Sequence, residues 1–505
     1  MRQYILLLLI GFGITLTSCR NDFDFESSNG GLRFSKDTVY LDTVFTNIGS
    51  STYTLKVYNK SDKNISIPSL KLGKGLTSKY RLMVDGIPGQ EFQNVEMLAK
   101  DSMYIFVSVT AEVADSNPTD FLYTDQILFG EGTNMQKVEL VTLIQDAVFL
   151  YPQKFGDGTT ETLPIGVDEI YGFFLDENDA TNGNELHWTN AKPYVVYGYA
   201  AVPPSKTLVV DAGARVHFHA ESGLIVANNA SLQINGSSSS TTALENEVIF
   251  EGDRLEPDFS EVPGQWGTIW LTQGSTNNSI SNLTIKNATV GLLVTGNDGT
   301  TTPTYITNTQ IYNCSNVGIL ARTGNINGKN VVINNCGQTS FAGSFGGSYE
   351  FTHCTFANYW SSPNQTAVLL DDFDGDALYA LTKADFKNCI IYGSTNLSIN
   401  LKKQGTIFNY SFDHCLIKFV DLGNQFGTNP LYQFSGSNYV NCLIATSSTN
   451  KKPFFKDPSN NELIIGENSA AKASANGIYS TFNDILNNPR TGLTDMGAYN
   501  SITFD

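Results

Sequence analysis

The sequence predicts an all-β protein in which an N-terminal β-sandwich is followed by a right-handed single-stranded parallel β-helix with a C-terminal cap. Three observations support this class. Short runs of alternating apolar and polar residues are interrupted by Gly, Asn, Asp and Pro. A motif recurs after 26 residues, from Ile280 to Ile306. Charged residues make up only 16% of the 505-residue chain, which disfavours long amphipathic helices.

The formal net charge of −18 restricts the expected partners. Nothing in this composition suggests a basic stripe that would neutralise a phosphate backbone, so we do not expect nucleic acid as a partner. An acidic surface also tends to repel polyanionic glycans. Neutral or cationic partners are therefore favoured.

Residues 1–18 have the features of a signal peptide. Arg2 supplies a positive charge, and the apolar run that follows is too short to span a bilayer. The boundary reads Leu-Thr-Ser-Cys and resembles a bacterial lipobox. This resemblance implies that Cys19 receives a diacylglycerol and becomes the first residue of the mature protein, which the lipid anchors to a membrane.

The residues after Cys19 indicate a destination. No acidic residue follows the cysteine directly, and the acidic cluster that comes next resembles the surface-export signals of Bacteroidota lipoproteins. We therefore expect a lipid-anchored protein of the cell outer membrane that is exposed at the cell surface. Residues 19–31 are polar and are expected to form a tether.

Residues 32–147 contain period-two runs such as Thr52–Tyr58 and Ser102–Thr110, which are typical of a β-sandwich. The stretches "TYTLKVYNKSDKNISIPSLKL" and "DSMYIFVSVT" resemble Ig-like domains of the ASPM/SPD-2/Hydin type. Residues 148–204 are less regular and are expected to be a connector.

Residues 205–445 are predicted to form the β-helix. Each apolar run is only about four residues long before a turn residue interrupts it, as expected where each coil buries its face against its neighbours. The repeated "ISNLTIKNATVGLLV" and "ITNTQIYNCSNVGIL" superimpose without a gap. Residues 206–445 resemble the β-helix of the pectin-lyase-like superfamily. The tail resembles the closing segment of such proteins, so residues 446–505 are expected to cap the last coil.

Six cysteines recur after an Asn or His in this region. Equivalent positions on successive coils lie side by side, so a single buried structural ladder is expected. Three disulfides are the alternative in an oxidising compartment. The cysteines are Cys314, Cys336, Cys354, Cys389, Cys415 and Cys442.

The superfamily resemblance implies that polysaccharide lyases and glycoside hydrolases must be considered. Asp372, Asp374 and Asp376 alternate around a Gly turn as calcium ligands do, although the spacing of an EF-hand is absent and a plain solvated loop is the favoured interpretation. Arg322, Lys329 and Asp372 are candidate catalytic residues. No Gly-His-Gly and no Arg-Ile-Lys occur in the chain, so the polygalacturonase pattern does not transfer.

Trp266 and Trp270 are four residues apart and would share a face of a strand. They are candidates for a sugar-stacking platform, and packing within an early coil is the alternative.

The sequence favours a surface lipoprotein that presents its β-helix as a non-catalytic binding or structural module for glycans or partner proteins. No cofactor is expected, although calcium is a candidate. The alternative functions are a polysaccharide lyase or glycoside hydrolase and a purely structural component of the envelope.

Overall fold

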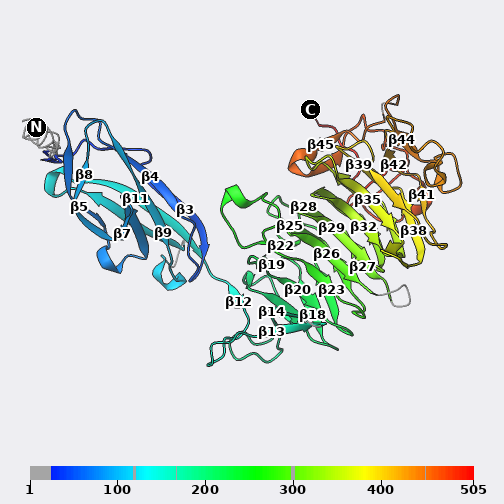
Figure 1. Ribbon diagram of the computed structural model, residues 1–505, viewed down its shortest axis with the longest axis horizontal. Coiled ribbons are helices and arrows are strands. Elements are labelled where there is room, and N and C mark those ends of the chain that lie inside the picture. The colour runs from blue at the N-terminus through cyan, green and yellow to red at the C-terminus, as the bar shows by residue number, and fades with distance from the viewer. Residues whose placement is uncertain (1–23, 118–120, 167, 297–301, 450, 505) are drawn as a thin grey trace, which may run out of the picture. The chain divides into compact units, whose positions relative to one another are not determined.

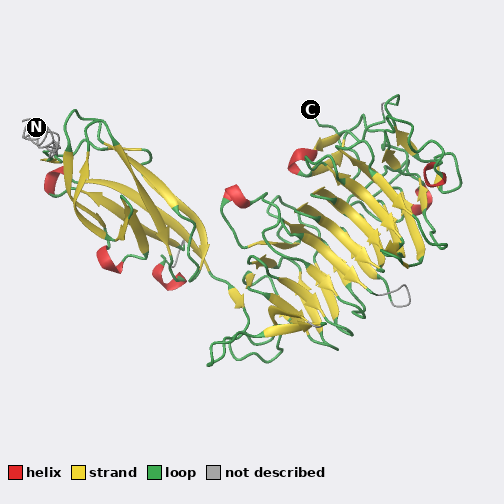
Figure 2. Ribbon diagram, viewed as in Figure 1, coloured by secondary structure: helices red, strands yellow, loops and turns green. Residues whose placement is uncertain are grey.

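The computed structural model describes residues 24–117, 121–166, 168–296, 302–449 and 451–504. The chain divides into two compact units, Met1–Asp146 and Ala147–Asp505 (Figure 1). Strands dominate both units, and the helices in the described part are single 3-10 turns (Figure 2). No helix among these residues is long and apolar enough to cross a bilayer. The turns are η1 (Gly75–Thr77), η2 (Val113–Asp115), η3 (Gly132–Asn134), η4 (Pro257–Phe259), η5 (Pro430–Tyr432), η6 (Pro458–Asn460) and η7 (Gly477–Tyr479).

The first unit is a β-sandwich of two sheets. Sandwich sheet 1 has the order β1 (Glu26–Ser27), β5 (Ile65–Leu72), β10 (Leu122–Phe129), β11 (Gln136–Gln145) and β3 (Thr38–Phe45), and β8 (Glu91–Met97) also pairs with β5. Sandwich sheet 2 has the order β2 (Arg33–Phe34), β4 (Tyr53–Tyr58), β9 (Ser102–Val109), β6 (Tyr80–Val84) and β7 (Ile87–Gly89).

Alternation along these strands builds the sandwich core. In β9, Ile105 and Val107 are fully buried while Tyr104 and Phe106 are exposed. The tether prediction needs correction at its C-terminal end. Glu26–Ser27 pairs in parallel with β5, because an extended backbone beside a free strand edge gains ladder hydrogen bonds.

The second unit is a parallel β-helix with three sheets, and each regular coil contributes one strand to each sheet. We call them sheets I, II and III. All their strand pairs are parallel except β13 with β14, which pair antiparallel.

Sheet I contains β12 (Val148–Leu150), β16 (Tyr194–Val196), β19 (Arg215–Phe218), β22 (Val248–Gly252), β25 (Leu283–Lys286), β28 (Gln310–Cys314), β31 (Val332–Cys336), β34 (Thr355–Asn358), β39 (Ile390–Gly393), β42 (Leu416–Lys418) and β44 (Leu443–Ala445). Sheet II contains β13 (Thr162–Ile165), β14 (Asp168–Phe174), β17 (Tyr199–Val202), β20 (Gly223–Val226), β23 (Ile269–Leu271), β26 (Val290–Thr295), β29 (Val317–Arg322), β32 (Thr339–Ser344), β35 (Thr366–Asp371) and β40 (Ile399–Lys402). Sheet III contains β15 (His187–Trp188), β18 (Thr207–Asp211), β21 (Ser231–Asn235), β24 (Ser279–Ser281), β27 (Thr304–Thr307), β30 (Asn325–Lys329), β33 (Gly347–Thr352), β38 (Leu381–Lys387), β41 (Ser411–Asp413) and β43 (Tyr439–Val440).

The predicted connector over 148–204 is wrong, because this stretch already supplies strands to all three sheets. Its apolar runs are shorter and its loops longer than in later coils, which hides the coil period. The 26-residue repeat is present, since Ile280 pairs with Ile306. In sheet II, however, Val290 pairs with Val317, because Asn316 is an extra residue in the preceding corner.

Identical faces of successive coils stack to form the β-helix core. In sheet III, the rings of Phe351, Phe386, Phe412 and Tyr439 lie on in-register neighbours. Their centroids are separated by 5.5, 5.0 and 5.3 Å in turn, each in a stacked arrangement. Each coil therefore buries its inner face against its neighbours, as in other solenoids.

The C-terminal segment occupies a different place from the one predicted. It does not close the end of the core but lies along the outer face of sheet I. Ile465 and Met496 pack there beside Leu443 of the last coil, and the segment extends to Tyr312 and Val332, which Tyr499, Ala498 and Ile485 cover. It includes the hairpin of β45 (Phe455–Asp457) and β46 (Glu462–Ile465). The segment lies there because sheet I has apolar side chains on its outer face, and contact with the segment removes them from water.

The last coils are covered instead by the segment that contains η5. Phe426, Leu431 and Phe434 pack against the β-helix core there. The Tyr432 hydroxyl accepts a hydrogen bond from the Leu401 backbone N–H at 2.8 Å. This segment closes the open end of the core and also forms one wall of the cleft described next.

Candidate functional site

A cleft of about 1160 Å³ lies on the outer face of sheet II near the C-terminal end of the β-helix. Its lining combines amide and hydroxyl side chains with a few apolar ones. The lining residues are Gly337, Gln338, Thr339, Trp360, Ser361, Ser362, Pro363, Asn364, Gln365, Thr366, Leu369, Ser394, Thr395, Asn396, Leu397, Ile399, Asn400, Lys402, Phe426 and Tyr432.

The floor of the cleft comes from strand register. Leu369 in β35 pairs with Ala342 in β32 on one side and with Asn400 in β40 on the other. Their neighbours Leu370 and Val368 are fully buried, so alternation turns Leu369 and Asn400 outward. Both are half-buried. The floor therefore offers an apolar surface beside an amide.

One wall is the loop between β34 and β35. The Gln365 side-chain amide donates to the carbonyl oxygen of Trp360 at 3.3 Å and to the Ser394 hydroxyl at 2.6 Å, which ties this loop to the next coil. The buried Gln365 Oε1 atom accepts no hydrogen bond within the described structure. An acceptor buried without a donor costs free energy, so this loop is held at some expense to stability.

The charge of the cleft differs from that of the whole protein. Among the described residues that line it, none is an aspartate or glutamate, and Lys402 is the one charged side chain. A glycoside hydrolase needs a pair of carboxyl groups across the scissile bond. This cleft lacks that pair, so its geometry suits binding through hydrogen bonds and ring stacking.

The acidic loop does not gather its three aspartates. Asp372 is fully buried, and its carboxylate accepts the backbone N–H groups of Gln404 and Gly405 at 2.7 and 2.9 Å. Asp374 and Asp376 are exposed on the hairpin of β36 (Phe373–Asp374) and β37 (Ala377–Leu378).

No cluster of three metal-ligating side chains occurs in the part of the chain that the structure describes. The alternating pattern therefore reflects a two-residue hairpin turn, and the structure does not bring together the three aspartates of the candidate calcium site. Asp372 bridges two loops and is not poised as a catalytic group. Its neighbour Asp371 has a raised pKa because of burial, and it accepts a hydrogen bond from the Phe345 N–H.

The candidate bases lie outside the cleft lining. The Arg322 guanidinium lies 5.6 Å from the centroid of the Phe345 ring, and the Lys329 amine lies 5.3 Å from the centroid of Phe482. Each cation therefore lies beside an aromatic ring, and neither residue lines the cleft. The structure does not bring Arg322 or Lys329 together with Asp372.

The two tryptophans do not form a platform. Trp266 is 1% exposed and stacks on Phe218 in the core, with ring centroids 4.4 Å apart. Trp270 is half-buried on the outer face of sheet II, where its indole N–H donates to Thr295 at 3.0 Å. The shared-face expectation is wrong, because Trp266 lies in the corner before β23 and only Trp270 lies in the strand.

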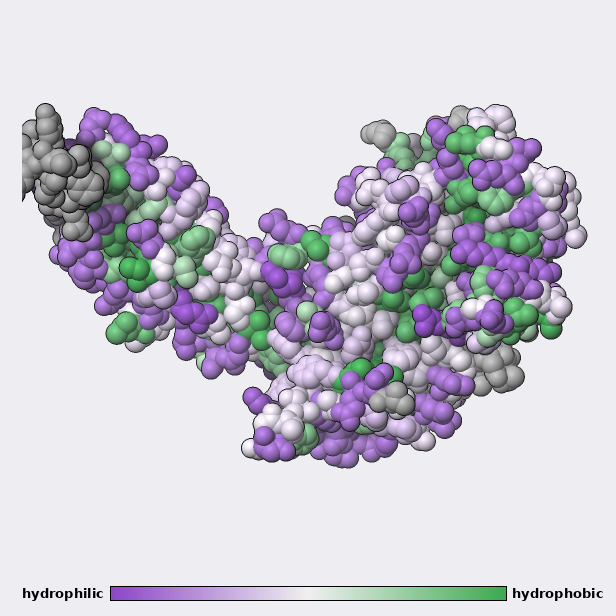
Figure 3. Space-filling model, viewed as in Figure 1, coloured by the Kyte–Doolittle hydropathy of each residue, from purple (hydrophilic) through white to green (hydrophobic). Residues whose placement is uncertain are grey.

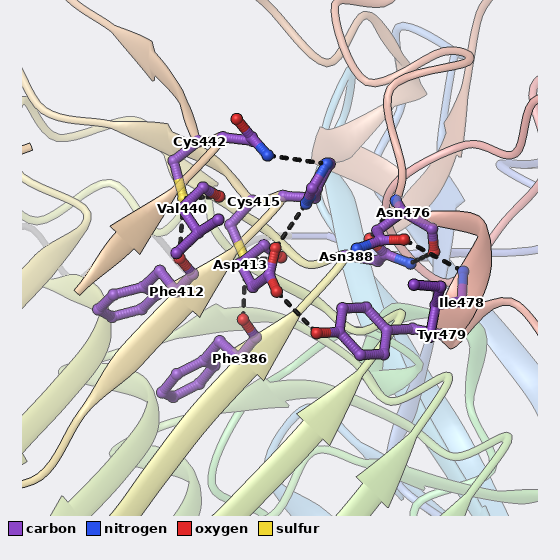
Figure 4. Close-up of polar contacts among 12 residues, drawn as sticks. Phe386, Asn388, Phe412, Asp413, Cys415, Val440, Cys442, Asn476, Ile478 and Tyr479 are labelled. Atoms are coloured by element: carbon purple, nitrogen blue, oxygen red, sulfur yellow. Dashed lines mark hydrogen bonds and ion pairs between the residues drawn. The ribbon is translucent and has the colours of Figure 1, made fainter. Parts of the chain in front are cut away.

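The cysteines are free thiols in two separate stacks. Cys314 and Cys336 pair in register at the corner between sheets I and II. The other stack lies at the corner between sheets III and I. The residue after each cysteine of this stack pairs in register with its counterpart in a neighbouring coil. The cysteines are Cys354, Cys389, Cys415 and Cys442. The single ladder is therefore corrected to two. Figure 4 shows Cys415 and Cys442 side by side, each donating to a backbone carbonyl of the preceding coil.

Both corners use the same local geometry, which explains the shared motif. The residue before each cysteine has a positive φ, for example 57° at Asn313 and 54° at Asn388. Asparagine tolerates this left-handed conformation better than most residues. The amides also link coils, since Asn335 donates to the Asn313 side-chain oxygen at 2.7 Å.

Cys19 lies outside the described residues, as does the predicted signal peptide. The cleft itself was not predicted. Its residues come from three coils and the closing segment, and no spaced motif unites them. The only local signal is the polar loop "SSPNQT" at 361–366, which interrupts the strand pattern.

No family model and no curated protein matches the chain. Two solved structures show a partial similarity. One is the periplasmic chaperone SfaE, at 15% identity and a TM-score of 0.16, covering 23% of this chain and 58% of that chain. The other is a family 123 glycoside hydrolase from Clostridium perfringens, at 9% identity and a TM-score of 0.16, covering 23% of this chain and 26% of that chain. This chain thus spans less than two thirds of either protein, and such low scores carry no argument about function.

Proposed function

We propose that the protein is a surface lipoprotein that binds glycans without cleaving them, through the cleft on sheet II. The observation that carries the proposal is the composition of this cleft. It combines many amide and hydroxyl groups with the aromatic rings of Trp360, Phe426 and Tyr432, and it has no carboxylate. Sugar hydroxyls need such donors and acceptors, and the apolar face of a sugar ring packs on an aromatic side chain.

The anchor belongs to the same proposal. The lipobox-like sequence at Cys19 supports attachment to the outer membrane, and the sandwich would then separate the β-helix from the lipid. Mass spectrometry of Cys19 after expression in a bacterial host would test this part. A diacylglyceryl modification is expected, and an unmodified Cys19 in the mature protein would contradict it.

A polysaccharide lyase is the second candidate, because Lys402 places an amine in the cleft. A lyase base removes a proton next to a uronate carboxylate. A hydrolase is disfavoured by the missing carboxylate pair. A partner protein is a further candidate occupant, since polar clefts also hold extended peptides.

The test is a screen of the protein against neutral and acidic polysaccharides, with and without calcium. Binding and the ultraviolet absorbance of unsaturated uronates are followed together. The proposal predicts binding to at least one polysaccharide with constant absorbance. Absorbance that grows with time would show a lyase, and the absence of any binding would remove the glycan proposal.

A further inference from the structure

The outer face of sandwich sheet 2 carries an exposed row of aromatic side chains. Tyr104 is 50% exposed and Phe106 is 38% exposed. Their ring centroids are 6.4 Å apart, and the ring planes differ by only 24°. Tyr58 extends the row on the neighbouring strand β4. Tyr104 and Phe106 lie on the solvent side of β9, whose alternate side chains Ile105 and Val107 fill the sandwich core.

Lysines hold parts of this row in place. The Lys56 amine lies 5.0 Å from the centroid of the Tyr104 ring and 5.5 Å from that of Tyr58. The Lys60 amine lies 4.6 Å from the Tyr58 centroid. Cation–π contacts of this kind restrict ring motion. The rings therefore form a partly ordered surface, which lowers the entropy lost when a ligand packs on them.

A groove of about 390 Å³ runs beside these rings. Tyr104 and Phe106 line it together with the carboxylates of Asp85, Glu96 and Asp101, all of which are exposed. The carboxylates come from the turn between β6 and β7, from β8 and from the residue before β9. They supply hydrogen-bond acceptors next to a flat apolar surface.

This combination fits a sugar chain better than an apolar partner. A pyranose ring has an apolar face that packs on aromatic rings and hydroxyls that donate to carboxylates. Three carboxylates would repel an anionic sugar, so the ligand should be neutral. Exposed aromatic pairs on a sheet also occur because they stabilise the sheet itself. That role does not account for the groove beside them, which is lined with hydrogen-bond acceptors. Figure 3 shows hydrophobic side chains reaching the surface of this unit among hydrophilic ones.

We propose that the groove beside Tyr104 and Phe106 is a second glycan site, which takes a neutral oligosaccharide. The sugar rings pack on the two aromatic side chains, and their hydroxyls donate to Asp85, Glu96 and Asp101. The site lies in the sandwich and does not depend on the cleft of the β-helix. A protein with both sites would hold a polysaccharide more tightly than either site alone, provided one chain reaches both.

The test is calorimetric titration of the protein with cellohexaose, xylohexaose, mannohexaose and hexagalacturonate. The parent, the double variant Y104A/F106A, Tyr40→Ala and Trp360→Ala are compared. Tyr40 is 65% exposed in β3 of the other sandwich sheet and serves as the matched aromatic control. Unchanged melting temperatures establish that each variant folds.

The proposal predicts that a neutral hexasaccharide binds the parent, Tyr40→Ala and Trp360→Ala, and binds Y104A/F106A at least tenfold more weakly. It is overturned if the double variant binds as tightly as the parent, if no neutral hexasaccharide binds the parent, or if hexagalacturonate is the preferred ligand. Loss of binding only in Trp360→Ala would also overturn it, while supporting the cleft of the β-helix.

Discussion

At the scale of single residues, His353 is the clearest case of a group held in one protonation state. Its Nε2 atom lies 2.9 Å from the Asn388 amide nitrogen and 2.8 Å from the Ser480 hydroxyl, and its Nδ1 lies 3.3 Å from the Gly497 carbonyl oxygen. The amide can only donate, so Nε2 accepts and Nδ1 carries the proton. Burial and then the charge of Arg490 lower the pKa of His353 to about 3.

This predicts a pH dependence of stability. The unfolded His353 has a pKa of about 6.5, so between about pH 6.5 and pH 3 the unfolded state binds more protons than the folded state. The free energy of unfolding should therefore fall as the pH drops through this window. The contribution of His353 amounts to a loss on the order of 3 kcal/mol between pH 7 and pH 4.

Denaturant unfolding of the parent and of His353→Asn, at pH 7 and at pH 4, checks this prediction. Asn occupies the equivalent position in the next coil, at Asn388, and it does not titrate. The variant should lose less stability on acidification than the parent. Equal losses in the two proteins would show that other groups account for the acid sensitivity.

The cysteine stacks predict the thiol content of the protein. Hydrogen bonding to Cys336 and burial raise the pKa of the Cys314 thiol well above its usual value, so it should react slowly in the folded state. Cys442 is half-buried and should react first. A thiol reagent in denaturant without reductant should then find all six cysteines of residues 24–505. Disulfide formation would appear as a lower thiol count.

At the scale of elements, Arg490 links two parts of the C-terminal segment to each other and to Asn330 of the β-helix. Its guanidinium donates to the carbonyl oxygens of Gly497 and Ala498 at 2.9 and 3.1 Å, and to the Asn330 side chain at 3.1 Å. Arg490→Met keeps most of the apolar volume but removes the donor to the Ala498 carbonyl oxygen and to the Asn330 side chain, whereas the Gly497 carbonyl oxygen keeps the His353 N–H. We expect a loss of about 1–3 kcal/mol in unfolding free energy.

Chemical denaturation with Arg81→Met as the control measures this loss. Arg81 is exposed on the sandwich and donates to the Thr110 hydroxyl at 2.7 Å. The control should change stability by less than about 0.5 kcal/mol. If Arg490→Met is as stable as the control, Arg490 does not stabilise the segment, which its apolar contacts and its other hydrogen bonds to the β-helix then hold.

The sequence was sufficient to predict the fold class and the strands of the regular coils, because alternation and a fixed repeat report directly on burial. It was not sufficient for the strands within 148–204, where long loops hide the repeat. Nor was it sufficient to distinguish the corner between sheets I and II from the corner between sheets III and I. In both corners a residue with positive φ, most often Asn, precedes a small side chain that points inward. A finer signal was present. Polar residues follow Cys314 and Cys336, whereas strand residues such as Ile390 and Leu416 follow the other stack at once.

The functional surfaces could not be predicted in the same way. The cleft depends on which loops of different coils meet, and this in turn depends on register and on the path of the closing segment. Trp360 lies in such a loop and has no motif around it. Trp266 was a candidate for sugar stacking in the sequence, but it is a core residue. The spacing of the two tryptophans could not show that Trp266 lies in a corner and not in a strand.

At the scale of the whole molecule, each unit has its own sheets and its own core. We therefore expect two calorimetric transitions. Ile105→Ala removes a buried side chain of the sandwich, and Phe386→Ala removes one of the β-helix. Each should destabilise its own unit by about 2–5 kcal/mol and leave the other transition in place. A single transition that shifts in both variants would show that the units unfold together.

The central claim is that the cleft of the β-helix binds a glycan without cleaving it. The most direct measurement starts from the Y104A/F106A variant, in which the sandwich site is removed. Trp360→Ala is added to this background, and the affinity for a polysaccharide is compared with that of the background alone. Tyr305→Ala, on the outer face of sheet III, is added in the same way as a matched control. We expect about tenfold weaker binding when Trp360→Ala is added, unchanged binding when Tyr305→Ala is added, and no new product in any sample. Unchanged affinity when Trp360→Ala is added, or product that accumulates in any sample, would contradict the claim.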